Sequence, residues 1–186
     1  MDERLHELGA AIVRALPGAV SDYSVAFGDL TVRAEAKDVV RVATFLRDDP
    51  RCQFWCIIDI TAVDWPSREN RFDVVYHFLS PKQNLRVRIK IETDEVTPVP
   101  SITGAFPGAD WFEREIYDLY GVLFTGHPDL RRILMWDEFE DHPMRKDYVQ
   151  PDDFEYEPTP HDEVLERAKE HYPARPEVNE TLTPQT

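Results

Sequence analysis

Residues 72–92 read FDVVYHFLSPKQNLRVRIKIE, and this stretch decides which kind of fold the chain can adopt. Its first eight residues are nearly all apolar, β-branched or aromatic, which is typical of a strand buried on both faces. After the turn PKQN, Leu85, Val87, Ile89 and Ile91 alternate with Arg86, Arg88, Lys90 and Glu92. This alternation predicts a second strand that is buried on one face only.

The chain before this stretch predicts two helices and a hairpin. Apolar residues recur at helical spacing over residues 5–16, where Pro17-Gly18 stops the run, and again over residues 39–46. Between them, residues 23–32 alternate in polarity around Gly28-Asp29, which predicts a β-hairpin with a two-residue turn. Together with the strands, this order predicts an α+β fold in which helices cover one mixed β-sheet.

Gln53 to Val63 (QFWCIIDITAV) is almost continuously apolar and predicts a central strand covered on both faces. If Cys52 and Cys56 share this extended geometry, their Cα atoms lie about 13 Å apart, which is too far for a disulfide. Two thiols alone cannot complete a structural zinc or iron–sulfur site. We therefore expect both cysteines to be buried and reduced.

Two features of the strands are candidates for function. His77 lies in the buried strand and is expected to be a hydrogen-bonded core residue rather than a ligand. Arg86, Arg88 and Lys90 form a basic row on an acidic protein. A solvated face is the favoured interpretation of this row, and a docking site for an acidic partner is the alternative.

Composition limits the classes of function that remain open. The 186 residues suffice for one sizeable core, and a hydrophobic content of 42% is ordinary for a globular protein. A net charge of −15 argues against non-specific nucleic-acid binding and against a polybasic membrane-surface mode, because both need clustered cations. No apolar run reaches the roughly eighteen residues of a membrane span, and the start MDERLHELGAAIVRAL resembles no targeting leader. We expect a soluble chain that stays where it is made.

Residues 111–148 read WFEREIYDLYGVLFTGHPDLRRILMWDEFEDHPMRKDY and concentrate aromatic, acidic and basic side chains. Helical spacing predicts a helix from Trp111 to Leu123, with Gly121 as a cap near its end. Asp129 is placed to cap a short helical turn, LRRIL, over residues 130–134. Asp141-His142-Pro143 then predicts a bend.

Three kinds of chemistry compete for this segment. A metal site would use Glu115 and Asp118 at i, i+3 with His127, Asp129 and His142, but the Glu-x-x-His and His-Glu-x-x-His pairings of metalloenzymes are missing. Nucleophilic catalysis lacks a Gly-x-Ser-x-Gly elbow, and seven glycines leave little scope for loops that cradle a cofactor. A structural role is favoured, in which arginines and carboxylates fix irregular backbone or another chain.

The same residues carry a family resemblance. Glu113-Arg114-Glu115, Asp118-Leu119-Tyr120, His127, Arg131, Ile133 and Leu134 match the signature of the 30-kDa subunit family of proton-pumping NADH–quinone oxidoreductase, respiratory complex I. DHPMRKDY (141–148) resembles that family's Gly-His-Pro-Leu-Arg-Lys-Asp-Tyr, and the segments 59–66, 72–80 and 85–91 resemble its core strands. The similarity covers roughly residues 45–148, and the chain departs from the pattern at Asp141, Met144 and Val149.

The resemblance implies a non-catalytic core subunit of the peripheral arm. It implies no cofactor in this chain, with FMN and the iron–sulfur clusters in other subunits that carry electrons from NADH to quinone. The implied partners are the large quinone-site subunit and the subunit with the terminal cluster. The residues expected to form the signature and interface are Glu113, Arg114, Glu115, Asp118, His127, Arg131, Arg132, His142, Arg145 and Lys146.

These expectations divide the chain into three parts. Residues 1–108 are the predicted α+β core, residues 109–149 the signature segment, and residues 150–186 a C-terminal extension. The extension has ten acidic and three basic residues and six prolines, with one predicted helix over 160–172. It is expected to be a flexible acidic end or an arm that orders on a partner.

The expected location is peripheral, on the cytoplasmic side of a bacterial inner membrane. Two other functions stay open at this point. One is the equivalent subunit of a membrane-bound hydrogenase or another quinone- or ferredoxin-linked complex. The other is an independent metal-dependent hydrolase.

Overall fold

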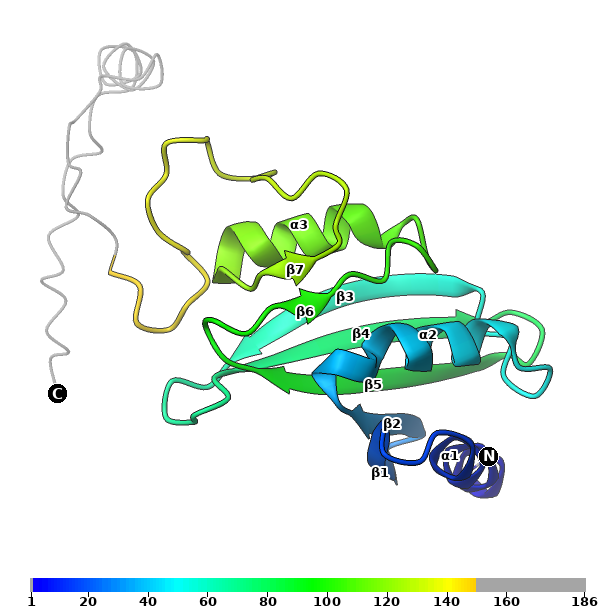
Figure 1. Ribbon diagram of the computed structural model, residues 1–186. Coiled ribbons are helices and arrows are strands. Elements are labelled where there is room, and N and C mark those ends of the chain that lie inside the picture. The colour runs from blue at the N-terminus through cyan, green and yellow to red at the C-terminus, as the bar shows by residue number, and fades with distance from the viewer. Residues whose placement is uncertain (1, 150–186) are drawn as a thin grey trace, which may run out of the picture. The chain divides into compact units, whose positions relative to one another are not determined.

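The computed structural model describes residues 2–149, which are built around a five-stranded β-sheet (Figure 1). The strands are β1 (Val20–Ala26), β2 (Asp29–Ala34), β3 (Cys56–Asp64), β4 (Phe72–Ser80) and β5 (Leu85–Thr93), in the spatial order β1-β2-β5-β4-β3. β2 and β5 are parallel, and the other neighbours are antiparallel. The predicted mixed sheet and α+β class are therefore confirmed, and β4 and β5 lie inside the sheet.

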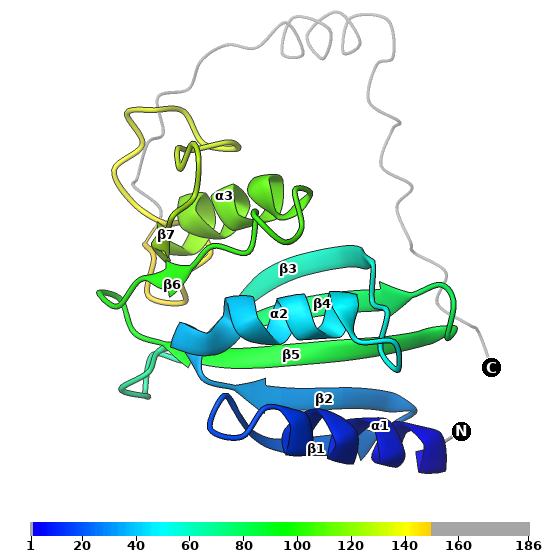
Figure 2. The same cartoon turned by 45° about the vertical axis from the view of Figure 1, so that its right-hand side comes forward.

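Three helices of the described residues cover the core of this sheet: α1 (Asp2–Ala15), α2 (Val39–Asp48) and α3 (Ala109–Tyr120). In both views α1 lies against the β1–β2 hairpin, α2 lies in front of β4 and β5, and α3 lies beside β3 (Figure 2). A 3-10 turn, η1 (Ala36–Asp38), leads into α2. Alternate side chains of β4, namely Phe72, Val74, Tyr76 and Phe78, are almost fully buried in the same core. Their burial supplies much of the free energy that holds helices and sheet together.

β3 is an edge strand, so the prediction of a central strand covered on both faces is wrong. Trp55, Cys56 and Ile58 are exposed, although Cys56 is predicted to be buried. A bulge interrupts the alternation, because Ile57 pairs with Phe78 while Asp59 pairs with His77, which leaves Ile58 as an extra residue. A continuous apolar run shows that both faces of a strand are apolar, but not that the same chain covers them.

Cys52 is buried, as predicted. Burial raises the pKa of its thiol to about 12, so Cys52 is a neutral packing residue at physiological pH.

The β1–β2 hairpin turns at Phe27-Gly28, one residue earlier than predicted. Ala26 pairs with Asp29, and Phe27 and Gly28 both have positive φ, +54° and +80°. Positive φ at both central residues is the geometry of a type I′ turn, which suits the twist of the paired strands.

β5 alternates as predicted, with Leu85, Val87, Ile89 and Ile91 buried. The basic row on its other face meets acids and hydroxyls of β2: Arg88 donates to Thr31 Oγ1 and Asp29 Oδ2, both at 3.1 Å. His77 is half-buried rather than in the core, where burial and the neighbouring Arg88 lower its pKa. These pairs suit a solvated face of mixed charge.

A short parallel pair follows the main sheet, formed by β6 (Val99–Pro100) and β7 (Phe124–Thr125). The sequence predicts only an irregular crossing there, because two residues are too few to show a periodicity. The pair joins the entry and exit of α3, since Val99 N–H donates to Leu123 O at 2.8 Å.

α3 spans Ala109–Tyr120 rather than the predicted Trp111 to Leu123, and Gly121 caps it in the left-handed conformation, as predicted. The predicted helical turn over residues 130–134 is wrong, because this stretch is irregular. Residues up to Val149 form one compact unit. The boundary at residue 108 stays a prediction, and the predicted helix over 160–172 lies outside the described residues.

Candidate functional site

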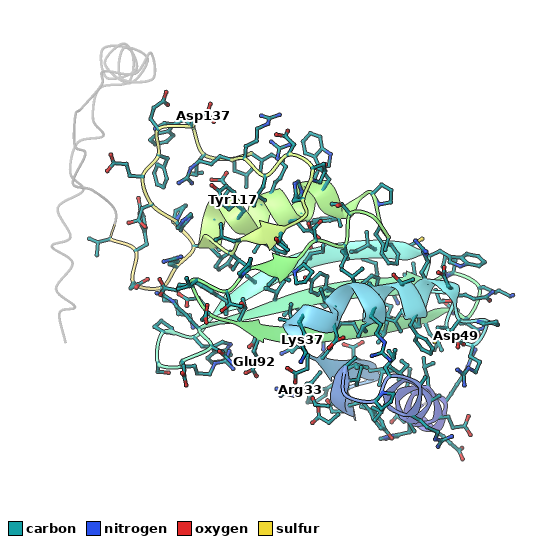
Figure 3. All side chains as sticks on the ribbon, viewed as in Figure 1. Arg33, Lys37, Asp49, Glu92, Tyr117 and Asp137 are labelled. Carbon is teal, nitrogen blue, oxygen red and sulfur yellow. The ribbon has the colours of Figure 1, made fainter. Side chains whose placement is uncertain are left out.

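The signature segment follows α3 as a long irregular loop that passes over the helix and returns to the sheet, yellow to orange in Figure 1. Irregular backbone needs partners for its N–H and C=O groups, which a helix or sheet would supply internally. Here side chains of α3 and of the β3–β4 region supply them. Figure 3 shows how densely polar side chains fill the space between the loop and α3.

Asp118 is the centre of this framework. Its side chain is 0% exposed, and Oδ2 accepts three successive backbone N–H groups, from Ile133 at 3.0 Å, Leu134 at 2.7 Å and Met135 at 2.9 Å. Oδ1 accepts from Arg132 Nη1 at 2.7 Å. One carboxylate therefore fixes the path of three loop residues and one arginine.

The ionised form of Asp118 is the form that this arrangement needs. Burial opposes ionisation, but the three N–H groups and the Arg132 guanidinium outweigh it, so the pKa of Asp118 lies below its usual value. A buried carboxylate without these donors would cost several kcal/mol. The helix and the loop therefore stabilise each other.

Two arginines extend the framework along the loop. Arg114, buried on α3, donates through Nε to Arg131 O at 3.2 Å and through Nη2 to Arg132 O at 3.1 Å. Arg132 donates back to Asp118 O at 3.2 Å and onward to Asp141 O at 3.1 Å. These contacts occupy the carbonyls that a helical turn over 130–134 would have used.

Both histidines of the segment build turns. His127 has a fully buried side chain whose Nδ1 accepts the Asp129 N–H at 3.0 Å, so its proton sits on Nε2 and points to Asp110 O at 3.1 Å. His142 Nδ1 lies 2.9 Å from Asp118 O and must donate, because a carbonyl only accepts. Burial lowers the pKa of His142, which favours the neutral ring.

Gly121 allows the loop to approach the end of α3. Its φ of +77° suits glycine, and a Cβ there would lie 2.5 Å from His142 Nε2 and 2.6 Å from Arg145 Nη2. Arg145 itself donates to Tyr120 O at 2.7 Å, which satisfies a carbonyl at the helix end.

A second cluster attaches the end of the segment to the sheet. Arg71 binds Asp64 with two parallel hydrogen bonds, of 2.6 and 2.9 Å, and also reaches Asp147 at 2.5 Å and Glu95 at 2.8 Å. Asp64 Oδ2 in turn accepts the Lys146 N–H at 2.7 Å. Arg71 holds the pKa values of Asp64 and Asp147 below their usual range.

Sequence reasoning missed this cluster. Asp64 and Lys146 are 82 positions apart, and Arg71 and Asp147 are 76 apart, so no local spacing connects them. The one available signal is that Asp64 and Arg71 bracket the predicted loop between two strands, where a paired arginine and carboxylate often close a turn.

Glu113 is buried in a different environment. Oε1 accepts the Ile102 N–H at 2.8 Å, while Oε2 has no hydrogen-bond partner among the described residues. Burial raises the pKa of Glu113, and burial with Glu113 nearby raises that of Tyr76, whose hydroxyl also lacks a partner among residues 2–149. Glu113 thus anchors the crossing before α3 and favours its neutral form.

The structure brings together most of the predicted signature residues. Asp118, Arg114, Arg132, His142 and Arg145 meet in one network with the loop backbone, and His127 closes the turn beside it. Three residues point elsewhere. Glu115 is exposed, Arg131 pairs with Asp129 at 2.8 Å, and Lys146 contributes its backbone N–H and lies over the Trp65 ring at 5.1 Å.

The proposed pairing of Glu115 with Asp118 in a metal site does not form, since Glu115 is exposed and Asp118 is fully buried. Across residues 2–149, no three His, Cys, Asp or Glu side chains come together in a way that could hold a metal ion. In the same part of the chain, no helix has the length and apolar character needed to cross a bilayer.

Comparison with known families identifies the segment's origin. Residues 32–158 match the family "Respiratory-chain NADH dehydrogenase, 30 Kd subunit". The chain belongs to this family. The match includes the core strands, α3 and the whole irregular loop, so the framework described above is part of the family region.

Individual relatives agree. The chain is 61% identical over 148 residues to the C-type subunit of the NADH-quinone oxidoreductase of Xanthobacter autotrophicus, covering 80% of this chain and 71% of that protein. It is 60% identical over 148 residues to the same subunit from Mesorhizobium japonicum, covering 80% and 74%.

A solved structure has the same fold at lower similarity. A chain in the structure of the membrane-bound sulfane sulfur reductase, an archaeal respiratory membrane complex, aligns with a TM-score of 0.65 and 22% identity, covering 97% of this chain and 98% of that one. At this identity the likeness concerns the fold alone.

The predicted family and the predicted membership of the NADH–quinone oxidoreductase complex are confirmed. The chain is therefore a subunit of a multi-subunit respiratory enzyme, and its partners include other subunits of that enzyme. Which subunits these are, and which cofactors they hold, stay predictions.

Proposed function

We propose that this chain is a structural subunit of the peripheral arm of NADH–quinone oxidoreductase, without a cofactor or catalytic residue of its own. In this proposal FMN and the iron–sulfur clusters lie in other subunits. The chain adjoins the large quinone-site subunit and the terminal-cluster subunit, on the cytoplasmic side of a bacterial inner membrane.

The observation that carries this proposal is how the signature residues use their charges. Asp118, Arg114, Arg132 and Arg145 direct their hydrogen bonds to backbone groups of the same chain. Residues that transfer protons or hold a cofactor need free polar atoms directed at a substrate. Groups used in this way give an irregular loop a fixed shape, which is what a permanent interface requires.

The experiment is purification of the complex from native membranes through an affinity tag on this chain. We expect flavin, iron–sulfur clusters and NADH–quinone activity to co-purify, while the chain expressed alone is colourless and holds no stoichiometric metal. Zinc or iron bound tightly to the isolated chain would contradict the proposal. Co-purification with a nickel–iron hydrogenase subunit instead would favour the related hydrogenase-type complex.

A pair of variants separates a structural role from a catalytic one. Asp118→Ala is expected to lower the amount of assembled complex several-fold while the turnover per assembled complex stays unchanged. Glu115→Ala, on the exposed side of the same helix, is the matched control and should leave both values unchanged. Normal assembly with lost turnover in Asp118→Ala would show that the residue takes part in the reaction.

A further inference from the structure

Three large apolar side chains stand exposed on the signature segment, where the framework beneath them is buried. Trp111, in the first turn of α3, is 64% exposed, and Leu134 and Trp136 on the loop are 57% and 63% exposed. We refer to these three residues as the tryptophan surface. Exposed tryptophans are unusual on a free surface and are enriched among residues that dominate protein–protein binding.

The tryptophan surface is held in place by a continuous series of contacts. Arg114 lies over the Trp111 ring at 5.5 Å and bonds the loop backbone at residues 131 and 132. Arg132 lies over the Phe139 ring at 5.5 Å, and Phe139 meets Trp136 edge to face at 4.8 Å. Leu134 is fixed through its N–H, which donates to Asp118.

This order matters energetically. A side chain that is already held in its binding position loses little conformational entropy when a partner covers it. The buried polar framework therefore has a second consequence, because it presents two indoles and a leucine at fixed positions around α3.

Carboxylates surround the tryptophan surface. The acidic residues of this part of α3 and of the loop are Asp110, Glu115, Asp129, Asp137, Glu138, Glu140 and Asp141. Figure 3 shows Asp137 at the outer bend of the loop, away from the sheet. Within residues 2–149, Glu115, Asp137, Glu138 and Glu140 make no ion pair, and the one cation exposed among them, Arg131, is neutralised by Asp129. The rim is therefore strongly negative.

We propose that the tryptophan surface docks a partner subunit through a face with an apolar centre and a rim of lysine or arginine. This inference rests on the proposed function, since it takes the partner to be a subunit of the same complex. A second copy of this chain would bring an equally acidic rim, and an anionic lipid surface would also be repelled. Charge complementarity thus selects a basic protein face.

The test uses membranes from a strain that lacks this chain, titrated with the purified full-length protein, with bound chain measured after sedimentation. We expect Trp111→Ala with Trp136→Ala to weaken binding at least about tenfold, since truncating a central tryptophan commonly has an effect of this size. Phe27→Ala, which truncates a fully exposed aromatic on the hairpin, is the matched control and should bind as the unchanged chain does.

Charge variants test the rim separately. Asp137→Lys with Glu138→Lys should slow association and remove most of its dependence on salt, because the attraction between rims becomes a repulsion. Circular dichroism and thermal unfolding of each isolated variant should match the unchanged chain, since all four residues are exposed.

The outcomes are distinguishable. If the unchanged chain does not rebind the depleted membranes or restore NADH–quinone activity, the proposed function fails. If it rebinds and the tryptophan variant rebinds equally well, only the docking surface is wrong. Equal binding to protein-free anionic vesicles, or concentration-dependent dimers of the isolated chain that the tryptophan variant abolishes, would assign the surface to lipid or to a second copy instead.

Discussion

The sheet and the signature segment are stabilised by different physical means. The sheet with its helices is held by apolar burial spread over some thirty side chains, among which no single one decides the topology. The segment from Gly121 to Tyr148 has little regular structure and depends on a few polar groups, above all Asp118 and Arg71, that each satisfy several partners. Distributed stabilisation tolerates local change, whereas concentrated stabilisation fails at single residues.

The largest expected effect is the loss of a core aromatic from the sheet. Phe78→Ala removes a ring that is 1% exposed and packs on Phe106 at 5.1 Å. Truncation of such a residue costs about 3–5 kcal/mol through lost burial and the cavity left behind. Chemical denaturation should show one cooperative transition at lower denaturant, and Val96→Ala, at an exposed site, should stay within about 0.5 kcal/mol of the unchanged chain.

Asp118→Ala should release the segment and leave the sheet folded. The variant loses the acceptor of three N–H groups and one guanidinium, so the loop needs water to replace them, at a cost of about 2–4 kcal/mol. Limited trypsinolysis with mass spectrometry should show faster cleavage after Arg131, Arg132, Arg145 and Lys146. If the whole chain unfolds at once and is digested from end to end, the two regions are a single cooperative unit and the comparison is wrong.

The same contrast explains what the sequence could predict. Strands β4 and β5 are visible because an alternating or continuous apolar pattern is local and extends over nine residues in each. The cap at Gly121 is visible for the same reason, since the apolar spacing of α3 ends there. Element bounds shifted by two or three residues, because the pattern shows which face is apolar and not where hydrogen bonding stops.

What the sequence could not show depends on distant partners. Asp118 and the loop N–H groups are 15 to 17 positions apart, and nothing about an aspartate on a helix indicates that it will accept backbone donors. The helical turn expected over 130–134 lost to these contacts, because a buried carboxylate offers the N–H groups a stronger acceptor than one turn of helix does. The family resemblance named the right residues, and only the structure gives Asp118 and Arg71 their physical roles.

Glu113 and Asp118 should give opposite dependences on pH. Burial raises the pKa of Glu113 in the folded chain, so its contribution to stability is complete below the unfolded value of about 4.3 and is lost as pH rises through the folded value. Asp118 has a lowered pKa, so its contribution is complete above about 3.9 and is lost only on acidification.

Glu113→Gln is the corresponding test, because glutamine keeps the acceptor for the Ile102 N–H and cannot ionise. The melting temperature of the variant, relative to the unchanged chain, should increase as pH rises above about 4.3 and then level off once Glu113 is ionised. Melting profiles that stay parallel across this range would mean that Glu113 has the same pKa in the folded and unfolded chain.

The smallest expected effect lies at the hairpin turn and is stabilising. Phe27 is fully exposed with a φ of +54°, a conformation in which asparagine is far more common than phenylalanine. Phe27→Asn should therefore raise the free energy of unfolding by about 0.5–1 kcal/mol, measured by chemical denaturation. Trypsin cleavage after Arg131 and Arg145 should not change, since a segment that opens locally does not sense the stability of the sheet. Slower cleavage in this variant would show that the segment opens only when the sheet unfolds, and the separation of the two regions would then have to be abandoned.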